Sequence, residues 1–504
     1  MSRIKDFLDS KTVKNNSETE ETVLTWRETL SYGMGRGAQG MSTSMMSSTN
    51  INYFMTNLLD ISEKAVGHIR LWCGIWDAFN DPIMGILVDK TRTKDGQMRP
   101  YIRVAPAISA FFTVLLFIAR ISLPVWLRFA IAVVAMVGWD MSYTAFDIPM
   151  GALAFSMTGN STERTKLYGV SSIMRAVLGA IPQGFVMIGL MVPYFKTTTA
   201  PLYMLSALAA GVGMILLSRP AYKNTRERAH HDSEEPTVSE CFRLLIKNKP
   251  LFMLFLANMA FLLVTVNSSV TTFVAVDLLG NSSFQAPLQI AVAPAPFIAG
   301  VFVPMVVEKL GKKADFAKIY RSCCLIAAAM DGLFFAVCYK KLVYFDPING
   351  RLEWYWVVIM MAFIALVAIP LEFKNLLGKE MEAETVDYVE YKTGRRAEGI
   401  MLSLMSFTGK LTNSVSSTIG LWTLSAAAYV SHNDALPAAQ PFSARLALLM
   451  CITLIPMAGY LLMLIPMKFY GITRENHEQM LKEIKARRAK RGSAGEEATV
   501  CSPE

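Results

Sequence analysis

The sequence predicts an all-α integral membrane protein with twelve transmembrane helices in two six-helix bundles. Of its 504 residues, 53% are hydrophobic and 18% are charged, and the mean hydropathy is +0.35. Apolar runs of about 20 residues, long enough to cross roughly 30 Å of hydrocarbon, recur along nearly the whole chain. A soluble chain of this length usually divides into several domains with polar surfaces. The composition therefore disfavours hydrolases, disulfide scaffolds and nucleic-acid-binding proteins.

The expected spans follow one another with charged, proline or glycine residues between them. They begin near residues 30, 65, 103, 126, 168, 200, 250, 286, 316, 354, 398 and 443. The widest polar gap in mid-chain, residues 219–250, separates the first six spans from the last six. The predicted organisation is an N-terminal segment (1–29), a first bundle (30–219), a linker (220–249), a second bundle (250–470) and a basic tail (471–504).

The position of the basic residues predicts the orientation. The net charge is +9, but Lys and Arg lie mainly between the spans, so the charge does not indicate a nucleic-acid partner. Lys and Arg in short loops stay in the cytoplasm during insertion. The loops after even-numbered spans are basic and the opposite loops are poorer, with Lys340 and Lys341 as an exception. We expect a multi-pass protein of the plasma membrane, with both termini, the linker and the tail cytoplasmic.

Three smaller features complete this picture. The polar N-terminus lacks the apolar stretch of a cleaved secretory signal. The seven cysteines lack CxxC spacing and indicate neither a disulfide framework nor a zinc site. The sequence VDK at 88–90 resembles VEK at 307–309, a trace that repeated transporter halves can leave and that can also arise by chance.

The first two spans carry unusual polar groups. The stretch MSTSMMSSTNINYF (41–54) is rich in hydroxyls, amides and methionine, which should face either an aqueous cavity or another helix. In IWDAFNDPIMG (75–85), Asp77 and Asp81 are four residues apart and share a helix face beside Asn80. Because membrane carboxylates cost several kcal/mol each, by order of magnitude, they need a compensating cation or proton. Carboxylate, amide and hydroxyl oxygens suit a hard cation such as Na⁺, although a helix-end pair bonded to backbone or arginine is the alternative.

The fourth span carries a second set of acids. Asp140, Thr144 and Asp147 lie on one helix face in GWDMSYTAFDIPMGA (138–152), beside Trp139 and Tyr143. Four carboxylates on two helices of one half indicate a binding site, and Trp139 and Tyr143 belong to its expected substrate-binding set. Two isolated cations at membrane depth, Arg175 in the fifth span and Lys410 in the eleventh, can pair with an acid or a polyhydroxylated ligand. Either can instead extend toward the membrane surface, more plausibly Arg175.

The segment EAETVDYVEYKTGRRAEG (382–399) lies on the expected cytoplasmic side, between the tenth and eleventh spans. Its charged residues, among them Asp387, Glu390 and Arg396, can form a network that holds the two halves together when the cavity faces outward. A solvated loop is the alternative interpretation, because exposed ion pairs contribute little unless they form a network.

These motifs resemble the glycoside-pentoside-hexuronide:cation symporter family of the major facilitator superfamily. The resemblance covers nearly the whole chain through LSYGMGRG (30–37), IWDAFNDPIMG (75–85), TRTKDGQMRPYI (91–102), YTAFDIP (143–149), VDYVEYKTGRRAEG (386–399) and Lys410. It implies the major facilitator fold. It also implies roles in cation binding (Asp77, Asn80, Asp81, Thr144), sugar contact (Asp147, Arg175), a lysine near both sites (Lys410) and a cytoplasmic gate (Asp387, Glu390, Arg396).

The sequence departs from the melibiose-type pattern of that family on the sugar side. Gly40 stands where an acidic sugar ligand is expected, and Gly151 stands where a tryptophan is expected. Asp140 is an additional acid where the pattern has glycine. It takes over a hydroxyl-binding or proton-carrying role, or it forms a structural pair with a neighbouring cation or tyrosine.

We therefore expect a secondary transporter that moves a glycoside or related small sugar by alternating access, coupled to Na⁺ or H⁺. The alternative is a cation-coupled carrier of a non-sugar or amphiphilic, lysolipid-like substrate, with a cavity wall formed by the methionine-rich first span. No His or Cys arrangement has catalytic spacing, so we expect neither an enzyme nor a cofactor beyond the coupling ion. The expected partners are a small glycoside, a monovalent cation and the lipid bilayer, and the expected state is a monomer.

Overall fold

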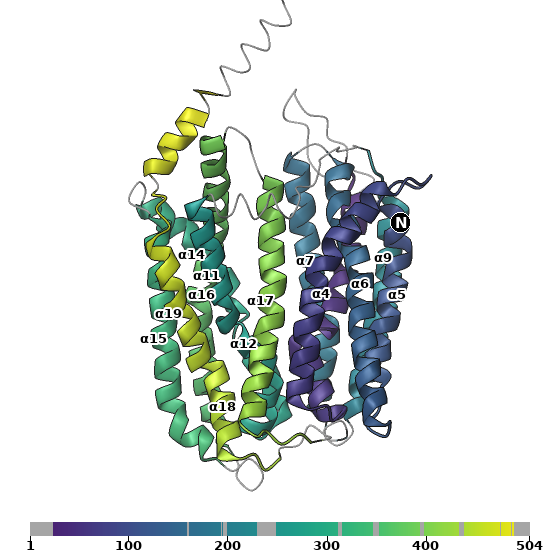
Figure 1. Cartoon of the computed structure of the whole chain (residues 1–504), viewed down its shortest axis with the longest axis vertical. Coiled ribbons are helices and arrows are strands. Elements are labelled where there is room, and N and C mark those ends of the chain that lie inside the picture. Colours follow the sequence, from purple (N-terminus) through teal and green to yellow (C-terminus); the bar gives the residue numbers. More distant parts are fainter. Residues whose placement is uncertain are drawn as a thin grey trace, which may run out of the picture.

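The computed structural model describes residues 24–158, 161–192, 194, 199–228, 248–310, 315–345, 352–393, 398–432, 438–473, 475–484 and 486–487. These residues are nearly all helical, and they form two helical bundles that lie side by side (Figure 1). Helices suit a membrane because they satisfy their backbone hydrogen bonds within one segment. This agrees with the all-α integral membrane fold that the composition predicts.

The first bundle contains eight described helical segments. They are α2 (Trp26–Met45), α3 (Ser48–Tyr53), the π-helix η1 (Phe54–Leu58), α4 (Glu63–Lys90), α5 (Arg99–Ile118), α6 (Val125–Met157), α7 (Ser161–Gly189) and α9 (Thr199–Asn224). The start of α2 is fixed by a capping box, in which the Thr25 hydroxyl accepts from the Glu28 backbone N–H and the Glu28 carboxylate accepts from the Thr25 N–H.

The second bundle is divided into more segments. It contains α11 (Lys249–Val264), α12 (Val266–Phe273), the π-helix η2 (Val274–Leu278), the 3₁₀-helix η3 (Ser282–Phe284), α13 (Gln285–Ile290), α14 (Pro294–Leu310), α15 (Phe316–Val343), α16 (Trp354–Thr393), α17 (Glu398–Ala426), α18 (Phe442–Ile452) and α19 (Leu454–Lys468). A helical segment begins near each of the predicted span starts.

Nine helices or helix pairs of the described chain are long and apolar enough to span a bilayer. The helical segments at α2, α4 and α17 are not among them. These three carry the start of the polar stretch at 41–54, the acidic pair and Lys410, respectively. The same polar residues that indicate a site therefore lower the hydropathy of the helices that bear it.

The two bundles begin with the same backbone pattern. In the first, α2 is interrupted at 46–47, continues as α3 and ends in the π-helix η1. In the second, α11 is interrupted at Thr265, continues as α12 and ends in the π-helix η2. The π-helices are shifted by 220 residues, from 54 to 274. This correspondence supports the internal repeat that the VDK and VEK sequences suggest.

Hydrogen bonds join the bundles near one end. We call the end where α9 stops and α11 starts the linker end, and the opposite end the far end. Near the far end, Thr49 donates to the Ser268 carbonyl at 2.7 Å, and Asn52 donates to the Ser417 hydroxyl at 2.9 Å. Deeper toward that end, Asn57 donates to the Tyr429 hydroxyl at 3.1 Å. The two halves are thus joined by hydrogen bonds on the far side of the bundle.

Candidate functional site

Asp77 and Asp81 face the second bundle and meet its lysine. The Lys410 Nζ donates to Asp77 Oδ1 at 3.0 Å and also to Asp81 Oδ2. This contact requires α17 to approach α4 closely, and the glycines of α4 allow it. A Cβ on Gly74 would lie 2.2 Å from the Ser414 side chain. The ammonium group therefore lies between the two carboxylates and bridges the bundles.

The remaining predicted cation ligands lie beside this ion pair. Asn80 on α4 and Thr144 on α6 are each 2% exposed, and Thr144 lies near Asp81. The second oxygen of Asp81 and the amide nitrogen of Asn80 have no hydrogen-bond partner. The structure thus gathers carboxylate, amide and hydroxyl groups in one place, with one carboxylate oxygen unused.

Asp140 joins this group from α6. One of its carboxyl oxygens is buried without a hydrogen-bond partner, and its charged neighbours are Asp77, Lys410 and Asp81. Sequence reasoning missed a second cation here, Arg70 on α4, whose charge interacts with Asp140. Arg70 donates to the hydroxyls of a serine in each bundle, at 2.7 and 3.3 Å. The only signal for it was an arginine within an apolar span.

The predicted sugar-contacting residues form a separate group on α2, α6 and α7. Asp147 accepts a hydrogen bond from the Arg36 guanidinium at 3.0 Å. The Arg175 guanidinium lies 3.4 Å from the Tyr143 hydroxyl, and Trp139 stacks on Tyr143 with ring centroids 5.0 Å apart. Arg36 was contained in the LSYGMGRG motif but was not singled out. The group brings two guanidinium ions and one carboxylate together beside stacked aromatic rings.

The two glycine departures have different structural meanings. A Cβ on Gly40 would lie 2.4 Å from the Arg175 carbonyl oxygen, and Gly179 lies against the Gly40 backbone. Any side chain at Gly40 must push α2 away from α7. At Gly151, by contrast, no heavy atom lies within 4 Å of the position of a Cβ. An acid at position 40 is therefore incompatible with this helix packing, whereas position 151 leaves open space.

The predicted gate residues lie at the linker end of α16. Asp387 Oδ2 lies 2.9 Å from His477 Nε2, at the start of a helical tail segment over 475–484. Glu390 is 9% exposed. Arg396 lies outside the described residues. The contact between the halves that we predicted for this segment stays a prediction, because its partner here is the tail.

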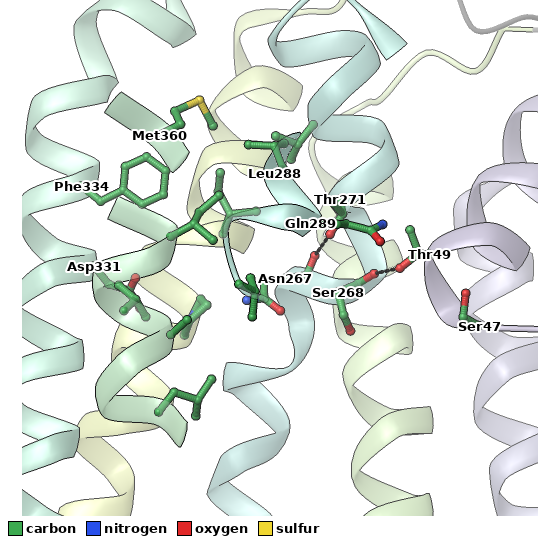
Figure 2. Close-up of a pocket in the computed structure, with 18 of the residues that line it drawn as sticks. Ser47, Thr49, Asn267, Ser268, Thr271, Leu288, Gln289, Asp331, Phe334 and Met360 are labelled. Carbon is green, nitrogen blue, oxygen red and sulfur yellow. Dashed lines mark hydrogen bonds between the residues drawn. The ribbon is translucent and has the colours of Figure 1, made fainter. Parts of the chain in front are cut away.

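A cavity of about 480 Å³ lies between the bundles. The first bundle contributes Ser44, Ser47, Thr49 and Gln183, and the second bundle contributes most of the wall, including Asn267, Gln289, Asp331, Phe334 and Met360 (Figure 2). None of the predicted site residues that the structure describes lines it. The methionines of the first span, Met41, Met45 and Met46, are buried in hydrophobic core and do not form its wall.

Comparison with known proteins places this geometry in context. Residues 31–474 match the family described as MFS/sugar transport protein. A glucuronide carrier protein homolog of Escherichia coli (strain K12) is 25% identical and covers 92% of this chain and 96% of its own. An isoprimeverose transporter of Lactiplantibacillus pentosus is 25% identical, with coverage of 95% and 96%. A putative glycoside/cation symporter of Escherichia coli (strain K12) is 22% identical, with coverage of 95% and 99%.

Solved structures show the same fold. A bacterial homolog of the human lysosomal transporter Spinster, in an inward-facing and unoccupied conformation, matches with a TM-score of 0.61 at 14% identity, covering 90% of this chain and 97% of its own. A D-xylose-proton symporter matches with a TM-score of 0.57 at 13% identity, covering 89% and 97%. At this identity the likeness shows the fold alone.

Proposed function

The chain belongs to the MFS/sugar transport protein family, and we propose that this multi-pass transporter moves a glycoside or related small sugar by cation-coupled symport. The resemblance of relatives that are named as carriers of glucuronides, of isoprimeverose or of glycosides with cations supports this proposal. Further support comes from the charge balance between α4, α6 and α17.

The observation that carries cation coupling is an excess of carboxyl groups. Among the residues that the structure describes, the cations beside Asp77, Asp81 and Asp140 are Lys410 and Arg70. If all three acids are ionised, the cluster carries one net negative charge. A buried charge of this kind is costly at membrane depth and needs compensation. One Na⁺ or one H⁺ supplies it, with Asn80 and Thr144 as further oxygen ligands for Na⁺.

Lys410 links cation binding to movement of the two bundles. In the structure its ammonium group occupies the position between Asp77 and Asp81, and it belongs to the opposite bundle. A bound Na⁺ competes with Lys410 for the same oxygens. Cation binding therefore loosens one tie between α4 and α17 and frees the bundles to rearrange around the substrate. By reciprocity, the sugar must raise cation affinity by the factor by which the cation raises sugar affinity.

The sugar is expected to lie against Asp147, Tyr143, Arg175 and Trp139, with Arg36 as an added contact. A carboxylate and a guanidinium offer an acceptor and a donor for hydroxyl groups, and the stacked rings offer an apolar face. Two guanidinium ions against one carboxylate leave a net positive charge in this group. That balance favours a sugar with a carboxylate over a neutral one.

By the positive-inside rule, the linker end and both termini lie in the cytoplasm. The proposal further takes the protein to be a monomer in the plasma membrane. The far end then faces outward, and its hydrogen bonds close the outer side. In the opposite state, Asp387, Glu390 and Arg396 are available to tie the halves together on the cytoplasmic side.

An amphiphilic substrate is the second candidate, favoured by one observation. The wall of the cavity is mostly apolar where the second bundle forms it, at residues such as Phe334, Met360 and Ile364. The first span does not supply this wall.

Uptake into proteoliposomes distinguishes the two candidates. Methyl glycosides, pentosides and hexuronides are offered with an inward Na⁺ gradient, with an inward H⁺ gradient, and with neither. The proposal predicts accumulation of at least one sugar that depends on one gradient. Uptake of lysolipid with no uptake of any sugar contradicts it.

A further inference from the structure

The cavity between the bundles lies where helices from both bundles are interrupted. Interruptions between α2 and α3, α11 and α12, α13 and α14, and α18 and α19 each have cavity-lining residues beside them, namely Ser47, Asn267, Gln289 and Ile452. Interrupted backbone at membrane depth is tolerated where it is buried in protein or lines a cavity. In transporters, such breaks near mid-membrane border the substrate and ion sites.

Among the described residues that line the cavity, Asp331 is the one Asp, Glu, Lys or Arg. It lies near the middle of α15, is 2% exposed, and one of its carboxyl oxygens has no hydrogen-bond partner. Figure 2 shows it across the cavity from Asn267 and Gln289, whose side chains are uncharged amides. The sequence analysis did not select it, because it has no acidic neighbour at helical spacing.

No described cation lies beside Asp331 on the helices that pack against α15. On α16, the Lys374 Nζ lies 3.7 Å from the centre of the Phe261 ring and 5.8 Å from that of Tyr320, and Tyr320 is about three helical turns before Asp331. On α18, Arg445 is held at the far end by the Phe345 carbonyl. On α19, the facing titratable group is the phenol of Tyr460, which lines the same cavity.

We propose that Asp331 binds and releases a proton during each transport cycle, so that the transporter carries H⁺ together with the sugar. An ionised carboxylate without a counter-ion in this largely apolar cavity costs several kcal/mol, by order of magnitude. The neutral acid is therefore the form that fits the cavity as the structure shows it. When the cavity opens to one aqueous side, the O–H bond of the acid breaks and its proton passes to water. The carboxylate accepts a proton again from water on the other side.

This inference rests on the proposed transport function and assigns a proton site in the second bundle, separate from the carboxylates of α4 and α6. Two measurements on proteoliposomes test it. Sugar counterflow, with no ion gradient, reports binding and movement of the sugar. The change in pH of a weakly buffered external medium after sugar addition reports proton uptake. The probes are glucuronic acid and the methyl β-glycosides of glucose, galactose and xylose.

Asp331→Asn is the main variant, because its amide keeps the size of the side chain and cannot exchange a proton. We expect it to retain counterflow and to lose sugar-dependent alkalinisation of the medium. Asp331→Glu restores a titratable group and should regain proton uptake. Asp315→Asn is the matched control, since Asp315 lies at the start of the same helix in an ion pair of 3.3 Å with the exposed Lys318. It should behave as the wild type.

Three results overturn the inference. The first is proton uptake by Asp331→Asn equal to that of the wild type. The second is sugar exchange by the wild type without any proton movement. The third is loss of both counterflow and proton uptake in Asp331→Asn and in Asp331→Glu. The last result assigns Asp331 to sugar binding or packing. Absence of counterflow for every probe in folded wild-type protein contradicts the transport proposal itself and is thereby distinguished from these outcomes.

Discussion

Replacing Lys410 by Gln should raise the affinity of the empty carrier for its cation. The ammonium group bonds to Asp77 and Asp81, so a cation must displace it or bind beside it. A unit charge at about 4 Å contributes about 4 kcal/mol at an effective dielectric of about 20. The Lys410 side chain is 31% exposed and can move aside, so we take about half of this value. About 2 kcal/mol corresponds to roughly a 30-fold lower dissociation constant.

Intrinsic tryptophan fluorescence of purified protein, titrated with Na⁺ at fixed pH and with H⁺ without Na⁺, measures this affinity. Lys410→Arg keeps the charge and is the matched control, expected to bind the cation about as the wild type does. The same competition predicts slower sugar accumulation in Lys410→Gln, since the cation then has no ammonium to replace it on release. Equal cation affinity in wild type, Lys410→Gln and Lys410→Arg refutes the proposed competition.

Three further predictions concern other parts of the structure. Gly40→Ala should lower the unfolding free energy by about 1–3 kcal/mol through overpacking, because its Cβ would lie 2.4 Å from the Arg175 carbonyl oxygen. Gly151→Ala has open space around its Cβ and should leave the melting temperature nearly unchanged. Equal melting temperatures of the two variants contradict the packing argument. Arg36→Gln should weaken binding of a hexuronide by about tenfold, or 1.4 kcal/mol, and Arg36→Lys by less, as measured by calorimetry; a stronger effect on neutral glycosides argues against a positively charged sugar site. Asp277→Ala should shift the carrier away from the state closed at the far end, because this fully buried carboxylate accepts a hydrogen bond from the Tyr429 hydroxyl at 2.7 Å. Labelling of cysteines introduced at the far end should then increase, and an unchanged labelling rate excludes this role.

The sequence predicted the helices and the proximity of Asp77 and Asp81, because both depend on short-range patterns. Span starts follow apolar runs, and the shared face of Asp77 and Asp81 follows from the four-residue helical repeat. The pairing of these acids with Lys410 joins residues more than 300 positions apart. The residues indicated that Lys410 can pair with an acid, and only the family resemblance implied a position near this site. The close approach of α17 to α4 at Gly74 shows why no local pattern could give it.

The helix interruption at Thr265 was outside the reach of sequence patterns. Pro149 and Pro370 lie inside continuous helices, whereas the break at Thr265 has no neighbouring proline or glycine. The break at Thr265 therefore does not follow from local propensity, whereas the breaks at 291–293 and at Thr453 lie just before Pro294 and Pro456. Asp331 was missed for a related reason, because a single acid in an apolar span becomes informative only when the cavity beside it is known.

Electrometry on proteoliposomes tests coupling of the sugar to a cation at Asp81 most directly. Rapid addition of glycosides, pentosides and hexuronides, with and without Na⁺ and at two pH values, should evoke a transient current in the wild type for at least one sugar. The account predicts that this current depends on one cation and disappears in Asp81→Asn. A sugar-evoked current of equal size in Asp81→Asn, or sugar uptake without any cation dependence, contradicts the account.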